Sequence, residues 1–400
     1  MALKPIGGEI EAQVLNDNFS YLDERIGLYT ETFEVLIPYD YPDLQAAVDH
    51  LSRFKASQGV RIVLKIASGH ALTKGLLVEN DDFGMFRIEA EDQEVFLDEN
   101  FTGPAVQPYD EGGNLIVGVN ARMPVLACII NMEGKGYAGY HATHSSNGFV
   151  EEGCGVKNAP FSGIEARSSY VYAYQTVFTG CMYGMRAQQG GVIAAHGSDC
   201  SGSTSDGILA SRGGTINFAR GIAQNCGTFG ARAQRSRLIC LGADFTGAGH
   251  TGIRAHENSQ IAATEAICND AGTYGIIATK ASSIDATRAI CNNAGESGIY
   301  ADEASVINAH FATCDNSIGT GMTALRSSLI NADGATARNA NLIGILSNRG
   351  STINANGADT SGASGNGFSV NRGSIISCRD GTGSLSQSAN TLTAAGIIFQ

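Results

Sequence analysis

The sequence predicts an all-β protein, a three-sheet parallel β-helix preceded by a short helical segment, and three observations support this prediction. A glycine recurs at spacings of 21 to 23 residues from position 163 to position 367. Within each repeat, apolar and small residues occupy pairs of alternate positions, which is the period of a strand with one buried face. The composition of 51 glycines, 7 prolines, no tryptophan and 16% charged residues suits short strands joined by many tight turns.

The repeat begins at a glycine that is followed by an apolar residue and then, two positions later, by a small residue. Such regular internal similarity is typical of a solenoid. The position three after the glycine is mostly alanine, the ninth is isoleucine from the second copy onward, and the sixteenth is cysteine in four copies. The ten glycines are Gly163, Gly184, Gly207, Gly230, Gly252, Gly275, Gly298, Gly321, Gly344 and Gly367. The isoleucines are Ile193, Ile216, Ile239, Ile261, Ile284, Ile307, Ile330, Ile353 and Ile376.

Each repeat is expected to form one coil of the β-helix. Offsets 1 and 3, 9 and 11, and 14 and 16 from the glycine form three pairs of inward positions, which predicts three short strands per coil of about 23 residues, with coils stacked roughly 4.8 Å apart. The interior of such a solenoid is narrow, so one large aliphatic residue fills each strand and its partner must be small. Ile284 followed by Ala286 in "SSIDA" follows this rule.

Polar residues also recur in columns, and we expect most of them to be structural. Serine stands seven after the glycine, asparagine or aspartate often ten after it, and a charged residue usually five after it. Asparagine tolerates left-handed turn conformations, and its amide can pair with the copy above. The charged column is predicted to lie at a solvated turn. Its members are Arg212, Arg235, Glu257, Lys280, Glu303, Arg326, Arg349 and Arg372.

The first 160 residues lack this period and predict a different organisation. A heptad-like seam in residues 1–36 favours a short parallel coiled coil, with an amphipathic helix lying on its own domain as the alternative. Residues 37–57 contain a capping helix at 43–55, because an open solenoid end needs a cover. Irregular coils are expected at 58–162, regular coils at 163–384 and a C-terminal cap at 385–400. The seam consists of Ala12, Leu15, Phe19, Leu22, Ile26, Tyr29 and Phe33.

The stretch "DLQAAVDHL" followed by "VRIVLKIASG" resembles the start of the pectin-lyase-like, right-handed parallel β-helix domains of bacteriophage tailspikes. The preceding "LNDNFSYLDERIG" resembles the virion-attachment segments of phage tail fibre proteins. The resemblance implies a homotrimer in the virion tail that is attached to a tail or baseplate protein through residues 1–36 and binds a host surface polysaccharide. It transfers no catalytic residue, because no catalytic motif of the family matches here.

Composition and charge disfavour several classes of binding partner. The formal charge of −13 disfavours nucleic acid and anionic membranes. The N-terminus has no apolar core of signal-peptide length, and no apolar run approaches transmembrane length, so we expect a protein made in the host cytoplasm without membrane insertion. The ten cysteines form no close C-x-x-C pair and are expected to be reduced and buried. No cofactor and no metal site is expected, since histidine is scarce and scattered.

The best candidates for a functional site lie between residues 137 and 206, where six of the 13 tyrosines fall within 47 residues. Aromatic faces suit sugar rings, and carboxylate pairs about 5–10 Å apart hydrolyse glycosidic bonds. An aromatic-packed section of the solenoid or an inter-subunit contact is the alternative. The candidate catalytic carboxylates are Glu151, Glu152, Glu165 and Asp199. The candidate glycan-binding residues are Tyr137, Tyr140, Arg167, Tyr170, Tyr172 and Tyr174.

A second cluster, "GHTGIRAHEN", places Arg254 and His256 two apart on one strand, facing outward together. A proton-transfer site is conceivable there, but a surface pair is favoured. Two function classes therefore remain open: a phage tail spike or fibre that recognises a host glycan, and a polysaccharide depolymerase, hydrolase or lyase, on the same fold. A bacterial surface adhesin is a third and weaker hypothesis, because no export signal is present.

Overall fold

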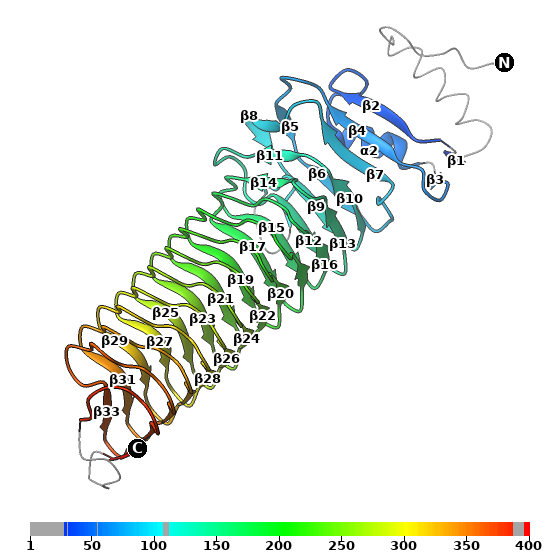
Figure 1. Ribbon diagram of the computed structural model, residues 1–400. Coiled ribbons are helices and arrows are strands. Elements are labelled where there is room, and N and C mark those ends of the chain that lie inside the picture. The colour runs from blue at the N-terminus through cyan, green and yellow to red at the C-terminus, as the bar shows by residue number, and fades with distance from the viewer. Residues whose placement is uncertain (1–27, 30, 54, 107–111, 387–395) are drawn as a thin grey trace, which may run out of the picture.

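The computed structural model describes residues 28, 29, 31–53, 55–106, 112–386 and 396–400. Within this part of the chain, the protein is a parallel β-solenoid with one short helix, as the repeat predicted. Figure 1 shows the coils stacked along a single axis, from the N-terminal coils in blue to the C-terminal coils in orange and red. No helix in these residues has the length and apolar content needed to cross a bilayer.

The first face of the solenoid is a 16-stranded sheet, called here the long sheet. Its strands follow one another in chain order, and each pairs in parallel with the strand of the next coil. The strands are β2 (Phe33–Ile37), β4 (Ile62–Ile66), β7 (Phe86–Ala90), β10 (Arg122–Leu126), β13 (Asn147–Val150), β16 (Tyr170–Tyr172), β18 (Val192–Ala194), β20 (Thr215–Asn217), β22 (Arg237–Ile239), β24 (Gln260–Ala262), β26 (Ser283–Asp285), β28 (Val306–Asn308), β30 (Leu329–Asn331), β32 (Thr352–Asn354), β34 (Ser374–Ser377) and β35 (Gly396–Phe399).

The second face is a 13-stranded parallel sheet, called here the second sheet. Each of its strands from β15 onward begins at or next to a repeat glycine. The strands are β6 (Leu76–Glu79), β9 (Ile116–Val119), β12 (Tyr140–Thr143), β15 (Ser162–Arg167), β17 (Tyr183–Gln188), β19 (Asp206–Ser211), β21 (Phe229–Gln234), β23 (Thr251–His256), β25 (Tyr274–Thr279), β27 (Ser297–Ala301), β29 (Thr320–Ala324), β31 (Ile343–Asn348) and β33 (Phe368–Asn371).

The third face is a sheet only in the early coils. There it contains β5 (Leu72–Lys74), β8 (Glu94–Thr102), β11 (Ile129–Asn131) and β14 (Gly155–Lys157). From Val177 to Thr382 it continues as a single parallel bridge per coil. The third strand predicted for each regular coil is therefore reduced to one paired residue, although its inward neighbours, such as Ala289 and Cys291, are buried as expected.

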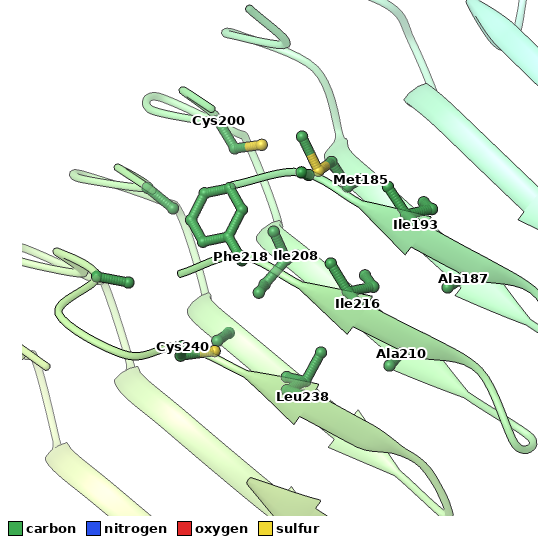
Figure 2. Packing of buried hydrophobic residues seen from close by; sticks show 14 of the residues in the cluster. Met185, Ala187, Ile193, Cys200, Ile208, Ala210, Ile216, Phe218, Leu238 and Cys240 are labelled. Carbon is green, nitrogen blue, oxygen red and sulfur yellow. The ribbon is translucent and has the colours of Figure 1, made fainter. Parts of the chain in front are cut away.

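The interior columns match the repeat, with one correction. Figure 2 shows Met185, Ile193, Ile208 and Ile216 directed into the core, with alanines and cysteines beside them. In the coil that starts at Gly230, however, the buried column position belongs to Leu238 and not to Ile239. This coil is one residue shorter before its long-sheet strand, and a shift of one residue reverses the facing of every side chain in a strand.

All ten cysteines are free, and nine of them are buried, in agreement with the prediction. Burial raises the pKa of the Cys181 thiol to about 12, so this thiol stays protonated and behaves as a small apolar side chain. Two aromatic rings in successive coils, Phe218 and Phe245, stack at 6.0 Å between centroids. They occupy interior positions where an alanine or cysteine stands in most other coils.

The repeat glycines are required because the coils approach closely at these positions. A Cβ atom on Gly275 would lie 2.5 Å from the Cβ of Cys291 and 2.6 Å from the carbonyl oxygen of Gly298 in the next coil. The same close contact recurs at Gly252 and Gly298. None of these three glycines has a positive φ, so space, and not a special backbone conformation, explains why glycine recurs there.

The polar columns form hydrogen-bond ladders along the solenoid. The backbone N–H of Ser282 donates to the hydroxyl of Ser305 at 3.2 Å, and the serine column from Ser236 to Ser374 continues this pattern. The side-chain amide of Asn331 likewise donates to Asn308 at 2.8 Å. The residues of the charged column all have φ between 46° and 58°, as expected for a turn. These ladders satisfy buried backbone donors, so they are structural.

The N-terminal end differs in part from the prediction. Helix α2 (Leu44–Leu51) lies where the capping helix was expected, with Asp43 as its N-cap and Leu44, Ala47, Val48 and Leu51 buried. Strand β2 already belongs to the long sheet, so the solenoid starts well before residue 58. Phe33 opens this strand, and Tyr29 lies in a short strand pair of β1 (Leu28–Tyr29) and β3 (Lys55–Ala56).

The helical seam predicted over residues 12–33 is therefore wrong at its C-terminal end, because the backbone there pairs as strands. The rest of that segment, residues 1–27, lies outside the described residues. At the other end of the chain, β35 pairs in parallel with β34 and so extends the long sheet by one strand. Whether the segment 385–400 caps the last coil stays a prediction, because residues 387–395 lie outside the described residues.

Candidate functional site

The four carboxylates predicted to be catalytic lie on three different faces of the solenoid. Glu151 directly follows β13 on the long sheet, and Glu152 is the next residue. Glu165 lies in β15 of the second sheet, whereas Asp199 forms a bridge of the third face. The single chain therefore places Glu151 and Glu152, Glu165, and Asp199 in three separate parts of the coil cross-section. The sequence did not show this, because the irregular coils hide which strand belongs to which face.

Glu165 is fully buried and is held by a network of polar side chains. It accepts hydrogen bonds from Arg167 at 2.5 Å, from Gln188 at 2.5 Å and from the hydroxyl of Ser162 at 3.1 Å. Burial pushes the pKa of Glu165 up, but the positive charges of His141, Arg186 and Arg167 outweigh it and hold that pKa below its ordinary value. A general acid needs a raised pKa, so these contacts argue against Glu165 as a general acid.

Two of the predicted glycan-binding residues are buried and cannot contact a ligand. Arg167 is only 5% exposed and is paired with Glu165. Tyr140 lies inside the solenoid, where its hydroxyl donates to the carbonyl of Pro124 at 2.8 Å and accepts from the backbone N–H of Phe149 at 3.2 Å. Burial raises the pKa of Tyr140. The predicted glycan-binding role of both residues is therefore wrong, because the strand alternation turns Tyr140 inward and the network around Glu165 holds Arg167.

Tyr137 lies on another part of the surface, where its ring stacks on Phe161 at 4.4 Å between centroids and 14° between planes. Phe161 in turn contacts Tyr183 edge to face at 5.3 Å. The guanidinium of Arg186 lies 4.8 Å above the Phe161 ring. This stacked group borders the second sheet. Tyr137 therefore does not share a site with Tyr170, Tyr172 and Tyr174, which lie in or next to the long sheet.

Tyr170, Tyr172 and Tyr174 form an aromatic ladder with Phe149 on the outer face of the long sheet. The ring centroids of Tyr170 and Tyr172 are 4.5 Å apart, those of Tyr172 and Tyr174 are 6.0 Å apart, and those of Phe149 and Tyr172 are 6.5 Å apart. Phe149, Tyr172 and Tyr174 are each more than 40% exposed. Phe149 and Tyr172 are register partners on β13 and β16, so their rings stand one coil apart.

The ladder borders a groove of about 470 Å³ on the same face. Strands β7, β10, β13 and β16 contribute its floor, and Arg87, Val125, Phe149 and Tyr172 follow one another in register across it. Glu151 also lines the groove, so two of the residues predicted from the sequence, Glu151 and Tyr172, share one site. We call this site the long-sheet groove.

Three arginines line the long-sheet groove. Arg87 forms ion pairs with both Glu89 and Glu151, and Arg122 lies 3.5 Å from a carboxylate oxygen of Asp82. The third arginine, Arg61, makes no ion pair with any residue that the structure describes. Three carboxylates thus lie against Arg87 and Arg122, and Arg61 is the guanidinium group left for an anionic ligand. Aromatic faces beside planar cations suit a ligand that carries both a sugar ring and an anionic group.

Sequence reasoning did not identify these three arginines. They lie in the irregular coils, where no repeat indicates which positions share a face. A local signal was present, since "VRIVLKI", "MFRIEA" and "ARMPVL" alternate each arginine with apolar residues. That alternation points the arginines outward once the neighbouring apolar residues are assigned to the core. Only the stacking of the coils, however, brings them to one groove.

Within the described ranges, no group of histidine, cysteine, aspartate and glutamate is placed to hold a metal ion. The residues of the long-sheet groove could instead bind a ligand directly, through charge-assisted hydrogen bonds and ring stacking. Glu151 lines the groove, and Glu89 lies beside it. Both contact the same guanidinium group of Arg87.

No protein-family model and no curated protein sequence matches this chain. Solved structures with a similar course of the chain include the periplasmic alginate epimerase AlgG, with a TM-score of 0.49, 10% identity and coverage of 77% of this chain and 83% of that chain. The Dettilon tailspike protein is similar with a TM-score of 0.41, 12% identity and coverage of 92% and 68%. The catalytic domain of a GH87 α-1,3-glucanase has a TM-score of 0.38, 8% identity and coverage of 92% and 68%. At these values the likeness transfers no residue role to this chain.

Proposed function

We propose that this protein is a phage tail spike or fibre that recognises an acidic polysaccharide of the host surface in the long-sheet groove. The observation that carries the proposal is the groove itself, in which exposed aromatic rings stand beside three arginines, and one of these, Arg61, makes no ion pair with a described residue. Aromatic rings favour the apolar face of a sugar ring, and guanidinium groups favour carboxylate or sulfate substituents. The phage assignment rests on the sequence resemblance of residues 10–70.

The net charge of −13 affects which polysaccharides the protein is expected to bind. Most of the surface repels an acidic chain, so binding depends on a local positive site, and the rest of the protein opposes nonspecific adhesion. The groove supplies such a site mainly through Arg61, because Arg87 and Arg122 are already paired with Glu89, Glu151 and Asp82. A neutral glycan would gain the ring contacts but not the ion pairs. We therefore infer a ligand with uronic acid or similar anionic sugars.

Substituting Tyr172 with alanine is expected to weaken binding to acidic polysaccharides by about tenfold, which corresponds to about 1.4 kcal/mol, because one stacking face is lost. Affinity electrophoresis in gels that contain polygalacturonate, hyaluronan or neutral dextran measures the effect. Tyr39→Ala is the matched control, since Tyr39 is 71% exposed and does not line the groove. Equal retardation of Tyr172→Ala and the parent protein, or stronger retardation by dextran, would contradict the proposal.

The proposed spike is a homotrimer attached to the tail through residues 1–36. Sedimentation equilibrium of the full chain should therefore give the mass of three 41.6 kDa subunits. The trimer brings several grooves to the same host surface, which raises the overall avidity without any new contact. A chain that sediments as a monomer at micromolar concentration would contradict the spike assignment, whereas the binding assay above would still test the groove.

Cleavage of the bound polysaccharide is the second candidate function. It is favoured by Glu89 and Glu151, which meet at one guanidinium group on the groove wall. A carboxylate base beside a cation is an arrangement that elimination next to a uronic acid carboxylate requires. Incubation with polygalacturonate distinguishes the two roles. New reducing ends, or absorbance from an unsaturated uronate, that disappear in Glu151→Gln would support cleavage, and their absence would leave recognition alone.

A further inference from the structure

Two arginines stand side by side on the outer face of the second sheet, away from the long-sheet groove. Arg232 in β21 and Arg254 in β23 are register partners on adjacent strands, so their backbones are separated by one strand spacing of about 4.8 Å. Both guanidinium groups lie above the ring of Phe229, at 5.1 Å and 5.3 Å from its centroid. The shared ring holds two like charges close together.

The surrounding side chains do not balance these two charges. Asp206 is fully buried, and one of its oxygens lies 2.8 Å from a terminal nitrogen of Arg232. Arg254 makes no ion pair with any residue in the described part of the chain. Glu257, which follows β23 directly, already contacts Arg235, His256 and Lys280. One carboxylate therefore faces two guanidinium groups, and like charges at this distance repel each other.

Burial makes this imbalance costly. The Nε atoms of Arg232 and Arg254 are both buried and have no hydrogen-bond partner among the residues that the structure describes. Burial lowers the pKa of Arg254, and the charge of Arg232 lowers it further. Arginine nevertheless stays protonated in proteins, so the site keeps its excess positive charge. The outer edges of both side chains remain partly exposed, so a ligand can approach from solvent.

We propose that Arg232 and Arg254 bind an oxyanion, such as phosphate, sulfate or a carboxylate, on the outer face of the second sheet. Two planar guanidinium groups on one ring present several N–H donors in fixed directions, which suits the oxygens of such a group. Asp206 balances one of the two positive charges, and a bound oxyanion neutralises the other. The same chemistry is found in a free inorganic anion and in an anionic substituent of a polysaccharide.

Thermal unfolding in phosphate tests the site directly. The unfolding midpoint of the full chain should rise with inorganic phosphate, and sodium chloride at matched ionic strength should not reproduce the rise, because only a ligand of the native state stabilises it. In Arg254→Gln the apparent affinity for phosphate should fall by about tenfold or more. Arg349→Gln, at an exposed turn of the charged column, should respond as the parent protein does.

Two further comparisons separate the sources of the anion and the two proposed sites. The same unfolding experiment is repeated with glucuronate and then with polygalacturonate instead of phosphate. A rise with the free anions alone indicates a free anion as the ligand, and a rise with polygalacturonate indicates a substituent on a polysaccharide chain. Tyr172→Ala should keep the full response to phosphate, since the long-sheet groove lies on another face. A parent protein without a phosphate-specific rise, or an Arg254→Gln variant with an undiminished one, would overturn the oxyanion site and leave the groove proposal untouched.

Discussion

Replacing Gly275 with valine is expected to destabilise the solenoid by about 3 kcal/mol or more, because the new side chain has no room. Its Cβ atom would lie 2.5 Å from the Cβ of Cys291 and 2.6 Å from the carbonyl oxygen of Gly298. The second of these is a backbone atom of the next coil, so the clash cannot be relieved by a rotamer change. Guanidinium-induced unfolding followed by far-ultraviolet circular dichroism measures the shift of the midpoint.

Ser283→Val is the control for this experiment, since Ser283 points outward from β26 on the same coil. Surface substitutions of this kind usually change stability by less than about 0.5 kcal/mol. Each coil is stabilised mainly by its two neighbours, so Gly275→Val should also raise amide exchange most strongly in the adjacent coils. A midpoint that equals that of Ser283→Val would show that the coils can separate locally without cost, and the close-packing argument would fail.

The regular coils could be predicted in detail because every coil repeats the same packing constraint. A buried isoleucine, a small partner and a glycine recur together, so the columns from Ile261 to Ile376 were assigned correctly. The assignment failed at Ile239, where the coil is one residue shorter and Leu238 takes the buried position. Counting from a fixed glycine carries no information about where a residue is lost within the coil.

The irregular coils set the limit of prediction for the candidate site. The aromatic zone was located from composition, and it contains the ladder of Tyr170, Tyr172 and Tyr174. The facing of each residue, however, depends on which of three sheets its strand joins, and residues 58–162 offer no repeat from which to read it. Tyr140 was therefore predicted at the surface although it is inside. Spacing of three and four near the N-terminus similarly predicted a helix where Phe33 begins a strand.

Removing the carboxylate of Glu165 should destabilise the protein strongly and so decide between a structural and a catalytic role. Glu165→Ala leaves Arg167 buried without its partner, and loss of one member of a buried ion pair typically costs about 3–5 kcal/mol. Glu265→Ala is the matched control. Glu265 and Arg288 form an ion pair in which both side chains are at least 60% exposed, and such pairs contribute at most about 1 kcal/mol.

The pH dependence of the same variant gives a second readout. The pKa of Glu165 is lowered in the folded protein by His141, Arg186 and Arg167 against the effect of burial. A lowered folded-state pKa stabilises the protein above the unfolded pKa of about 4.3, and this contribution is lost as the pH falls through the folded value. The stability difference between the parent protein and Glu165→Gln should therefore be constant near neutral pH and shrink below about pH 4.3.

A catalytic Glu165 would behave in the opposite way. Catalytic carboxylates are held in environments that disfavour their resting state, so their removal often leaves stability unchanged or higher. If Glu165→Gln unfolded at the midpoint of the parent protein across this pH range and abolished cleavage of polygalacturonate, the buried network would be an active site. The three hydrogen bonds to Glu165 and its lowered pKa argue for the structural role, because every donor around this carboxylate already stabilises its charged form.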